Sequence, residues 1–395
     1  MFKRIFIPFV SLFLVINSNG QKPISEADAV NMALKNSRNI SAAALSVLQQ
    51  KQLLKSTINL PNPEVFIESP TGNFYTGSIT QSIEFPTVYG KQYQLQKQKI
   101  VLAEKEKGVS ENDVKLQVKQ LYLLLQYAVA LQQQLFVQDT VYQRISTAGG
   151  RQFDAGQIDY LQKTVAESQY GEVHNQYVQA QISITNLQSQ LQYLTGSQEV
   201  FTVFPLDNNQ LTNKVVPTDS TLFDTNPSLQ IANQNTIISQ NNIDLQKAKA
   251  LPGLALGYFN QGERSTPIGN RFRFGFTVPL WFGQYKSNIA AAKTELDINK
   301  QKVNGLQQQL SVQLLQAQNE LAVYTQSLQY YQTTGLKKAN EIITTAKRLF
   351  DNGQNDYIGY LRNINDAYSI QLKYLEAIKN YNLSVLSIKY LTGTL

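Results

Sequence analysis

The 395-residue sequence predicts a mainly α-helical protein with a small β part, in which two tandem repeats each combine a long antiparallel coiled-coil hairpin with a pair of strands. Three observations predict this fold class. The segment Phe153–Tyr160 recurs as Phe350–Tyr357, 197 positions later; apolar residues follow a heptad spacing over long stretches; and each half has two short segments of alternating apolar and polar residues. The predicted division is 1–20 as a signal peptide, 21–196 as the first repeat, 197–225 as a connection and 226–395 as the second repeat.

A second duplicated motif indicates what lies between the copies. Leu191–Gly196 recurs as Ile388–Gly393 at the same offset of 197. In a helix that packs along a coiled coil, one inserted residue rotates every later side chain by about 100°. Such a helix tolerates no change of length, so we expect a long helix between the two motifs of each repeat.

The first twenty residues have the pattern of a targeting segment. Lys3 and Arg4 form a basic start, Ile5–Ile16 is apolar but too short to span a bilayer, and small residues at 18–20 suit cleavage. We expect a secretory signal that is removed before Gln21.

The composition excludes several functional classes. The chain has no cysteine, two methionines and one histidine, His174, which is interpreted as a surface residue; no metal site and no cofactor are expected. The formal charge is +7, and removal of the two cations Lys3 and Arg4 lowers it to +5 without leaving any Lys/Arg run that indicates nucleic acid. Nothing after residue 20 reaches 18 consecutive apolar residues, so no transmembrane helix is predicted. No nucleophile–base arrangement, phosphate loop or carboxylate pair stands out, so the protein is predicted not to be an enzyme.

The shorter elements follow from caps, prolines and alternation. A helix is expected from Ser25, as its N-cap, to about Ser56, ended by Pro61 and Pro63. The expected strands are Glu64–Ser69, Thr76–Phe85, Leu254–Asn260 and Arg271–Val278, and the helix before the second pair is Asn226–Ala250.

The long helices are predicted from heptad seams. Their outgoing members would span roughly 55–60 residues, or about 85 Å, which implies a rod or tube. Pro86 and Pro279 align at an offset of 193 but later motifs at 197, so four extra residues enter the second hairpin and should locally unwind its supercoil. The predicted seam residues are Leu121, Leu124, Ala128, Leu131, Leu135, Gln138, Tyr142, Ile145; Val173, Tyr177, Ala180, Ile184, Leu187, Leu191, Leu194; Leu314, Ala317, Leu321, Tyr324, Leu328, Tyr331; and Ile370, Tyr374, Ala377, Tyr381, Ile388, Leu391.

The alternating strands have two interpretations. Phe272, Phe274 and Phe276 alternate with small or charged residues, which suits a barrel wall with lipid outside and water inside. A small antiparallel sheet that covers a soluble core would alternate in the same way. Four strands cannot close a barrel, and open edges cannot exist in hydrocarbon, so the membrane interpretation requires several chains. Three chains would supply twelve strands.

Four ordered and partly duplicated motifs resemble the outer-membrane efflux protein family, the TolC-like channels, across essentially the whole mature chain. The short form without a C-terminal extension is most similar to the CusC/CzcC-like branch. Many members of that branch are lipoproteins, whereas this chain has no cysteine to acylate. The motifs are Ser25–Ser37; Pro86–Gly90 with Pro279–Gly283; Arg151–Gly156 with Arg348–Gly353; and Tyr193–Gly196 with Tyr390–Gly393.

The resemblance implies a homotrimer with a twelve-stranded β-barrel in the outer membrane and a helical tunnel through the periplasm. Its hairpin tips would dock on a periplasmic adaptor (a membrane fusion protein) and, through it, on an inner-membrane efflux pump of the RND type. The implied function is a passive exit duct for metal cations or small toxic compounds, in contact with outer-membrane lipid and without a nucleic-acid partner.

The duplicated tips are the first candidate site. Gly156 and Gly353 would allow a tight turn with positive φ. The acidic residues could form anionic rings around a threefold axis or cap the following helices, and the two arginines could bridge to them and hold the tip closed. The predicted gate and adaptor-docking residues are Arg151, Asp154, Gly156, Asp159, Arg348, Asp351, Gly353 and Asp356.

The strand ends supply the remaining candidates. Pro86, Gly90, Pro279 and Gly283 are predicted strand-to-helix junctions, followed or flanked by aromatic residues that suit a membrane interface. Arg271 and Arg273 are expected to face the barrel lumen, in preference to lipopolysaccharide phosphates. The predicted interface aromatics are Tyr89, Trp281 and Phe282.

Two other classes of protein compete with the duct. A periplasmic coiled-coil adaptor carries one hairpin between β-rich halves, and two hairpins with strands between them argue against it. A secreted coiled-coil fibre is disfavoured by the strict duplication and the paired strands.

Overall fold

The structure is a computed structural model that describes residues 23–69, 72, 75–206, 223–260, 267–280, 282–354 and 356–395. The expected signal peptide and Trp281 lie outside the described residues. The helices are α1 (Glu26–Asn36), α2 (Arg38–Lys55), α3 (Pro86–Asp154), α4 (Tyr160–Thr195), α5 (Pro227–Lys249), α6 (Phe282–Tyr330), α7 (Leu336–Asp351) and α8 (Tyr357–Leu391). The strands are β1 (Pro23–Ile24), β2 (Glu64–Glu68), β3 (Thr76–Ile83), β4 (Thr202–Val203), β5 (Gly253–Asn260) and β6 (Phe272–Thr277).

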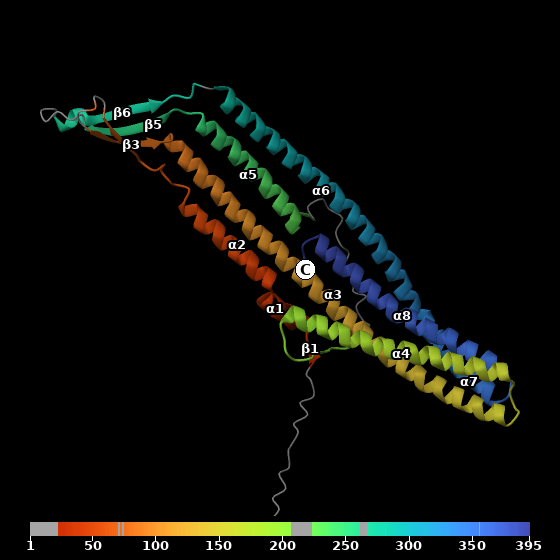
Figure 1. Cartoon of the computed structure of the whole chain (residues 1–395). Helices are drawn as coiled ribbons and strands as arrows, with labels where there is room; N and C mark the ends of the chain where they lie inside the picture. The colour runs from red at the N-terminus through yellow and green to blue at the C-terminus, as the bar shows by residue number, and fades with distance from the viewer. Residues whose placement is uncertain are drawn as a thin grey trace, which may run out of the picture.

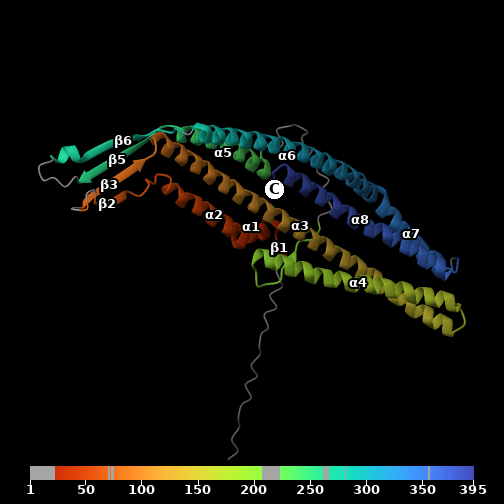
Figure 2. The same cartoon turned by 45° about the horizontal axis from the view of Figure 1, so that its top comes forward.

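The chain forms a long, curved wall, with a four-stranded sheet at one end and two hairpin tips at the other (Figures 1 and 2). The sheet has the order β2-β3-β5-β6 and every neighbouring pair is antiparallel. Each predicted strand is present, and the observed ends lie within two residues of those expected.

The helices lie side by side in one layer. Near the sheet the order is α2, α3, α5 and α6, and near the tips it is α4, α3, α8 and α7. Within the described residues, α2 and α4 border one side of the wall and α6 and α7 the other, and β2 and β6 are the corresponding edge strands. The wall therefore ends in two unpartnered borders.

The predicted first helix is two helices. The backbone of Ser37 is extended (φ −64°, ψ 122°), so α1 ends there. Its N–H donates to the Ala33 carbonyl at 2.9 Å, while its Oγ accepts the Ile40 N–H at 3.4 Å. One serine thus caps both helices, which the sequence alone did not distinguish from a surface serine within a helix. The N-cap predicted at Ser25 is present, since Ser25 Oγ accepts the Asp28 N–H at 3.1 Å.

Burial is divided among several small clusters along the wall instead of one central core. In α3, Ala128, Leu135 and Tyr142 of the predicted seam are buried. Further toward the sheet, Tyr122 and Leu125 are buried where Leu121 and Leu124 were expected. The long helix changes neighbours there, from α8 and α4 to α1 and α4, so its buried face changes as well.

The second outgoing helix is interrupted by a π-helical turn, Tyr331–Gly335, between α6 and α7. The equivalent helix of the first repeat, α3, is continuous over 69 residues. A π-turn holds more residues per turn than an α-helix and unwinds it locally. It lies in the stretch where the sequence offset changes from 193 to 197, the place at which local unwinding was predicted.

The connection between the repeats contains a short pairing that the sequence did not predict. β4 pairs in parallel with β1, with Ile24 opposite Val203. Strands of only two residues are too short to show an alternation of apolar and polar residues.

Among the residues that the structure describes, no helix is long and apolar enough to span a membrane.

Candidate functional site at the hairpin tips

Both hairpins turn through the predicted glycines. Gly156 has φ +69° and Gly353 has φ +70°. The Gly156 N–H donates to the Phe153 carbonyl at 2.9 Å and the Gln157 N–H to the Gln152 carbonyl at 2.8 Å. The same two bonds recur around Gly353. This is the Schellman arrangement, which ends a helix by placing a residue in the left-handed region and thereby favours glycine.

Two of the candidate acids cap the helices that follow the turns. Asp159 Oδ1 accepts the Gln162 N–H at 2.8 Å, while the Gln162 side chain accepts the Asp159 N–H at 3.1 Å. Asp356 Oδ1 accepts the Gly359 N–H at 2.7 Å. Both aspartates are exposed, so capping leaves their charge facing water. An anionic ring built from them stays a prediction.

The predicted arginine latch is absent from the described residues of one chain. Arg151 and Arg348 are exposed and form no ion pair there. Asp351 instead pairs with Lys347, one helical turn earlier, at 2.6 Å. An i, i+4 pair on one exposed helix face adds little to stability. It also does not join the two hairpins.

The contact that joins the two tips is made by Tyr357. This tyrosine begins α8 and is buried, and its hydroxyl donates to the Ile145 carbonyl of α3. The hydroxyl also packs over Gly149: an added Cβ there would lie 2.7 Å from Tyr357 Oη and 3.7 Å from Ala166 Cβ of α4. The absence of a side chain at Gly149 therefore makes room for the tyrosine between α3, α4 and α8.

Other aromatic residues extend this contact. The rings of Phe350 and Tyr360 stack at 4.6 Å, and those of Tyr142 and Tyr368 lie 6.1 Å apart. Burial raises the pKa of Tyr357 to about 12 and also raises the pKa of Tyr142 and Tyr360. The tips are thus joined by the neutral Tyr357 hydroxyl and by the contact of Tyr142 with Tyr368, within a packed aromatic cluster.

Further polar contacts join α3 and α8 along their length. The Gln134 side-chain amide donates to Gln371 Oε1, and the Tyr390 hydroxyl donates to Asp113 Oδ1 at 2.9 Å. Close to the first of these, Gln138 is buried. Its side-chain nitrogen finds no hydrogen-bond partner among the described residues.

The sheet has two chemically different faces. Residues that pair across the four strands share a face, and one face is apolar except for Gly77, Gln81 and Asn260. The opposite face carries serine, threonine, glycine, two glutamates and Arg273, with Phe66 and Phe259 as its large apolar residues. The apolar face consists of Val65, Ile67, Ile79, Ile83, Leu254, Leu256, Tyr258, Phe272, Phe274 and Phe276.

The two strand arginines differ. Arg273 lies on the polar face, with its guanidinium 3.7 Å from the centre of the Phe259 ring. Arg271 precedes the strand, in a 3₁₀ turn (Ile268–Arg271), and its Nη1 donates to Tyr258 at 3.4 Å and to Asn260 at 3.3 Å. Both of these partners belong to the apolar face. The alternation along the strand placed both arginines on the polar face, and only Arg273 lies there.

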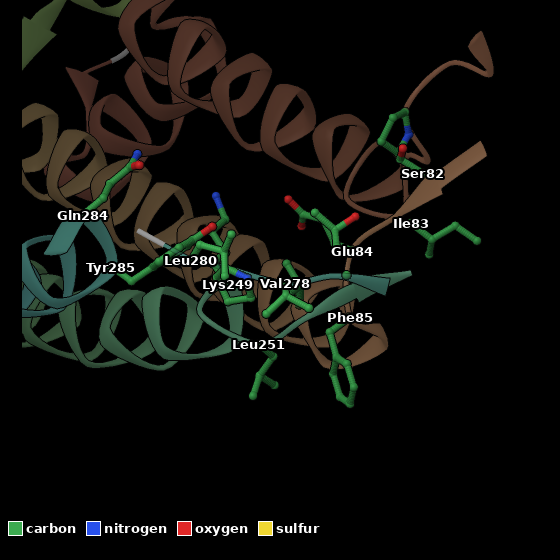
Figure 3. Close-up of a pocket in the computed structure, with 15 residues that line it drawn as sticks. Ser82, Ile83, Glu84, Phe85, Lys249, Leu251, Val278, Leu280, Gln284 and Tyr285 are labelled. Atoms are coloured by element: carbon green, nitrogen blue, oxygen red, sulfur yellow. The ribbon is translucent and has the colours of Figure 1, made fainter. Parts of the chain in front are cut away.

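A pocket of about 440 Å³ lies at the junction between the sheet and the helices (Figure 3). Glu84 and Lys249 both line it, beside Pro279. Pro86 begins α3 here, and the Tyr89 hydroxyl accepts the Glu84 N–H at 3.1 Å.

The other junction candidates have no such contacts. A Cβ added at Gly90 or Gly283 would meet nothing within 4 Å, so neither glycine is required for close packing within one chain. Phe282 begins α6 and is 69% exposed. Its place at a membrane interface remains a prediction.

Sequence reasoning found the turns but missed the contact between them. Gly149 and Gly150 stand together inside a long helix, where glycine is unfavourable, and such a pair is a usable signal for close approach of another segment. Nothing in the sequence indicated that Tyr357 is the approaching residue. The described residues contain no group of three or more His, Cys, Asp or Glu side chains that could hold a metal ion.

Comparison with known proteins agrees with these features. Residues 220–394 match the sequence profile of the outer membrane efflux protein family. The predicted resemblance is confirmed by this match. No curated protein sequence is significantly similar to the chain.

Solved structures show the same fold over nearly the whole chain. CusC matches with a TM-score of 0.74 at 16% identity, over 100% of this chain and 98% of its own. The Campylobacter jejuni CmeC outer membrane channel matches with a TM-score of 0.77 at 16% identity, over 99% of this chain and 94% of its own. The open state of the Neisseria gonorrhoeae MtrE outer membrane channel matches with a TM-score of 0.72 at 14% identity, over 94% of this chain and 89% of its own. The predicted fold class is confirmed.

Proposed function

We propose that this chain, whose residues 220–394 match the outer membrane efflux protein family, is one protomer of a passive exit duct in the outer membrane. The observation that carries the proposal is the wall with two unpartnered borders, joined to a sheet that is apolar on one face and polar on the other. A duct needs both features, because its wall must separate lipid from water and must close on itself.

The sheet supports the membrane part of the proposal. Phe274 and Phe276 are 80% and 74% exposed on the apolar face of an edge strand. So large an apolar surface is costly in water but favourable against lipid. The polar face, with Arg273 over Phe259, would then line the lumen.

The borders support a homotrimer. Backbone groups at the edges of β2 and β6 cannot remain unpaired in hydrocarbon, so each edge must pair with another chain. Three copies close a barrel of twelve strands, within the range of outer-membrane barrels. The borders formed by α2 and α4 on one side and by α6 and α7 on the other would meet in the same ring and form the periplasmic tunnel.

The tips are the proposed docking site for a periplasmic adaptor and, through it, an inner-membrane pump of the RND type. They lie at the end of the wall farthest from the sheet and expose Asp159 and Asp356 (Figure 1). Such acids near a threefold axis would raise the local concentration of cations. The proposed cargo is metal cations or small toxic compounds, conducted without tight coordination and selected by the pump.

The test is conductance of the detergent-purified protein in planar bilayers, with its mass determined on the same sample. The expected result is a trimer with a small, cation-biased conductance. A water-soluble monomer without conductance would contradict the proposal and would favour a periplasmic coiled-coil adaptor or scaffold.

A further inference from the structure

Within the described residues, β2 and β6 are the two edge strands of the four-stranded sheet. Strand direction alternates along the order β2-β3-β5-β6, so β6 runs opposite to β2. In the proposed ring, β6 of one copy would therefore meet β2 of the next as an antiparallel pair, like every other pair of the sheet. This pair rests on the proposed function, because it forms only if copies of the chain close a barrel.

The two faces of the sheet restrict the register of this pair. The apolar face contains Val65 and Ile67 of β2 and Phe272, Phe274 and Phe276 of β6. All five side chains are between 53% and 80% exposed, so none of them packs in the core of its own chain. A slip of one residue would turn the apolar residues of one strand to the polar face of the other. Only registers that differ by an even number of residues keep the faces together.

Closure of a barrel restricts the register further. A row of directly paired residues crosses the sheet from Glu64 on β2 to Arg273 on β6. If this row returned to Glu64 in the next copy, the strands would not tilt, whereas barrel strands tilt by about 35–45°. With about 3.3 Å per residue and about 4.8 Å between strands, a shift of four residues over four strands gives a tilt of about 35°. Shifts of two and six residues give about 19° and about 46°.

The lengths of the two strands select the shift of four residues. With this shift, all five residues of β2, Glu64–Glu68, face strand residues of β6, Arg273–Thr277. Without a shift, or with a shift of two, the end of β2 would face the 3₁₀ turn that precedes β6. A shift of six would place Glu64 opposite Pro279, past the end of β6, and a shift of four in the other direction would place Arg273 before the start of β2.

This register brings complementary side chains together on the polar face. Arg273 comes opposite Glu68, and Gly275 comes opposite Phe66, which is 45% exposed. Glu68 and Arg273 are exposed, and neither forms an ion pair within the described residues. The Phe259 ring, 3.7 Å from the guanidinium of Arg273, covers only the flat side of that group. The N–H donors lie in the guanidinium plane, where they can bond a carboxylate.

We infer that Glu68 of one copy pairs with Arg273 of the next on the polar face of the barrel, and that this pair, with Phe66 over Gly275, sets the register in which copies of the chain join. Opposite charges directly across two strands stabilise the strand pair, and like charges destabilise it. Each of the two charged residues obtains its partner from another copy, so the contact is complete only in the assembly.

Disulfide formation reads the register, because the chain has no cysteine of its own. Phe66→Cys is combined in turn with Gly275→Cys, Arg273→Cys or Thr277→Cys, and the full-length variants are oxidised in outer membranes and run on a non-reducing denaturing gel. Directly opposite residues have Cα atoms about 4.5–5.5 Å apart, which a disulfide can join. Displacement by two residues along the strand raises this distance to about 8 Å, which is too far.

The combination with Gly275→Cys should therefore give covalent multimers up to the trimer, and the other two combinations should remain monomeric on the gel. A link within one chain is excluded, because two strands separate β2 from β6. More complete linking through position 273 or 277 than through position 275 would overturn the inference.

Charge reversal tests the pair itself. Glu68→Arg and Arg273→Glu should each lower the temperature at which the purified trimer dissociates, and the double variant should restore it. Glu64→Arg is the matched control, since Glu64 faces Thr277 in this register, and it should not restore the trimer of Arg273→Glu. A double variant with Glu68→Arg that is no more stable than the single variants, or equal restoration by Glu64→Arg, would overturn the inference.

The mass of the unchanged protein separates failure of this inference from failure of the proposed function. A monomer that forms no covalent multimer in any cysteine combination contradicts the ring itself. A trimer that links through a position other than 275 contradicts only the register and the ion pair.

Discussion

Gly149 and Gly150 are adjacent glycines in the same helix, and they should respond in opposite directions to the same substitution. An alanine at position 149 would place its Cβ 2.7 Å from Tyr357 Oη and 3.3 Å from its Cζ. An alanine at position 150 would meet nothing within 4 Å. Gly150→Ala is therefore a matched control for Gly149→Ala.

The magnitude follows from terms that the two variants do not share. Both gain about 0.5–1 kcal/mol from replacing glycine inside a helix, and this gain cancels in the comparison. Gly149→Ala alone overpacks the Tyr357 site, at a cost of about 1–3 kcal/mol. It also displaces the hydroxyl from the Ile145 carbonyl, which removes about 0.5–1.5 kcal/mol. Together these terms separate the variants by about 1.5–4.5 kcal/mol in local stability.

Hydrogen exchange at the tip amides is the suitable assay, because a long wall with several separate core clusters need not unfold in one step. Each 1.4 kcal/mol corresponds to a tenfold change in an equilibrium constant. The amides at the end of α3 and the start of α8 should therefore exchange roughly 10- to 1,000-fold faster in Gly149→Ala than in Gly150→Ala. Amides near the sheet serve as the internal reference and should be unchanged.

The reasoning would be refuted by equal tip exchange in the two variants. It would equally be refuted if Gly150→Ala exchanged faster than Gly149→Ala. Either result would mean that Tyr357 does not depend on the empty space at Gly149.

Three further changes have defined outcomes. Asp159→Asn and Asp356→Asn should keep their helix caps, since asparagine also caps well, but should lower cation preference, read as a shift of the reversal potential under a salt gradient; an unchanged potential contradicts the anionic ring. The pKa of Tyr357 is raised to about 12, so its neutral form stabilises the tip fully below pH 10, and this contribution is lost as pH rises toward 12. The absorbance of tyrosinate, followed against pH, should show one fewer late-titrating group in Tyr357→Phe than in the unchanged protein. Identical titrations would count against a buried hydroxyl. Deletion of either tip, between Gly149 and Tyr160 or between Arg348 and Tyr357, should abolish efflux while trimers remain by mass, and normal efflux would exclude docking there.

The sequence predicted the hairpins, strands and turns because each leaves a local or periodic signal. Gly156 and Gly353 turn with positive φ, as their place in the duplicated motif indicated. The four strands were predicted from alternation, and their register places the alternating residues on separate faces. These features depend on residues close together in sequence or repeated at a fixed offset.

The contacts between segments far apart could not be predicted. The bond from Tyr357 to the Ile145 carbonyl joins positions 212 residues apart and depends on how two helices meet. The arginine latch was expected because opposite charges stand near each other in the sequence, yet Asp351 pairs with Lys347 on its own helix. The break between α1 and α2 depends on the extended backbone of Ser37. A capping serine permits this conformation but does not require it.

Glutamine side chains that bond between neighbouring helices show how a wall one helix thick keeps its register. Gln96 of α3 is buried and its side-chain amide donates to both the carbonyl and the Oε1 of Gln50 on α2, at 3.0 Å each. Gln234 of α5 makes the same pair of bonds to Gln98 on α3, at 3.1 and 2.9 Å. A helix carbonyl is reached this way only at one axial position, and a shift of one residue moves it by about 1.5 Å.

Neutral amides suit this role better than charges. An exposed ion pair contributes only about 0–1 kcal/mol, and burying one costs desolvation that its attraction often fails to recover. A buried amide that loses its partner leaves an unsatisfied donor, at a cost of about 1–3 kcal/mol. Slippage of α2 or α5 along α3 would break both bonds of the Gln96 or Gln234 bridge at once. The helices are therefore held in register near the sheet by amides and near the tips by the tyrosines of α8.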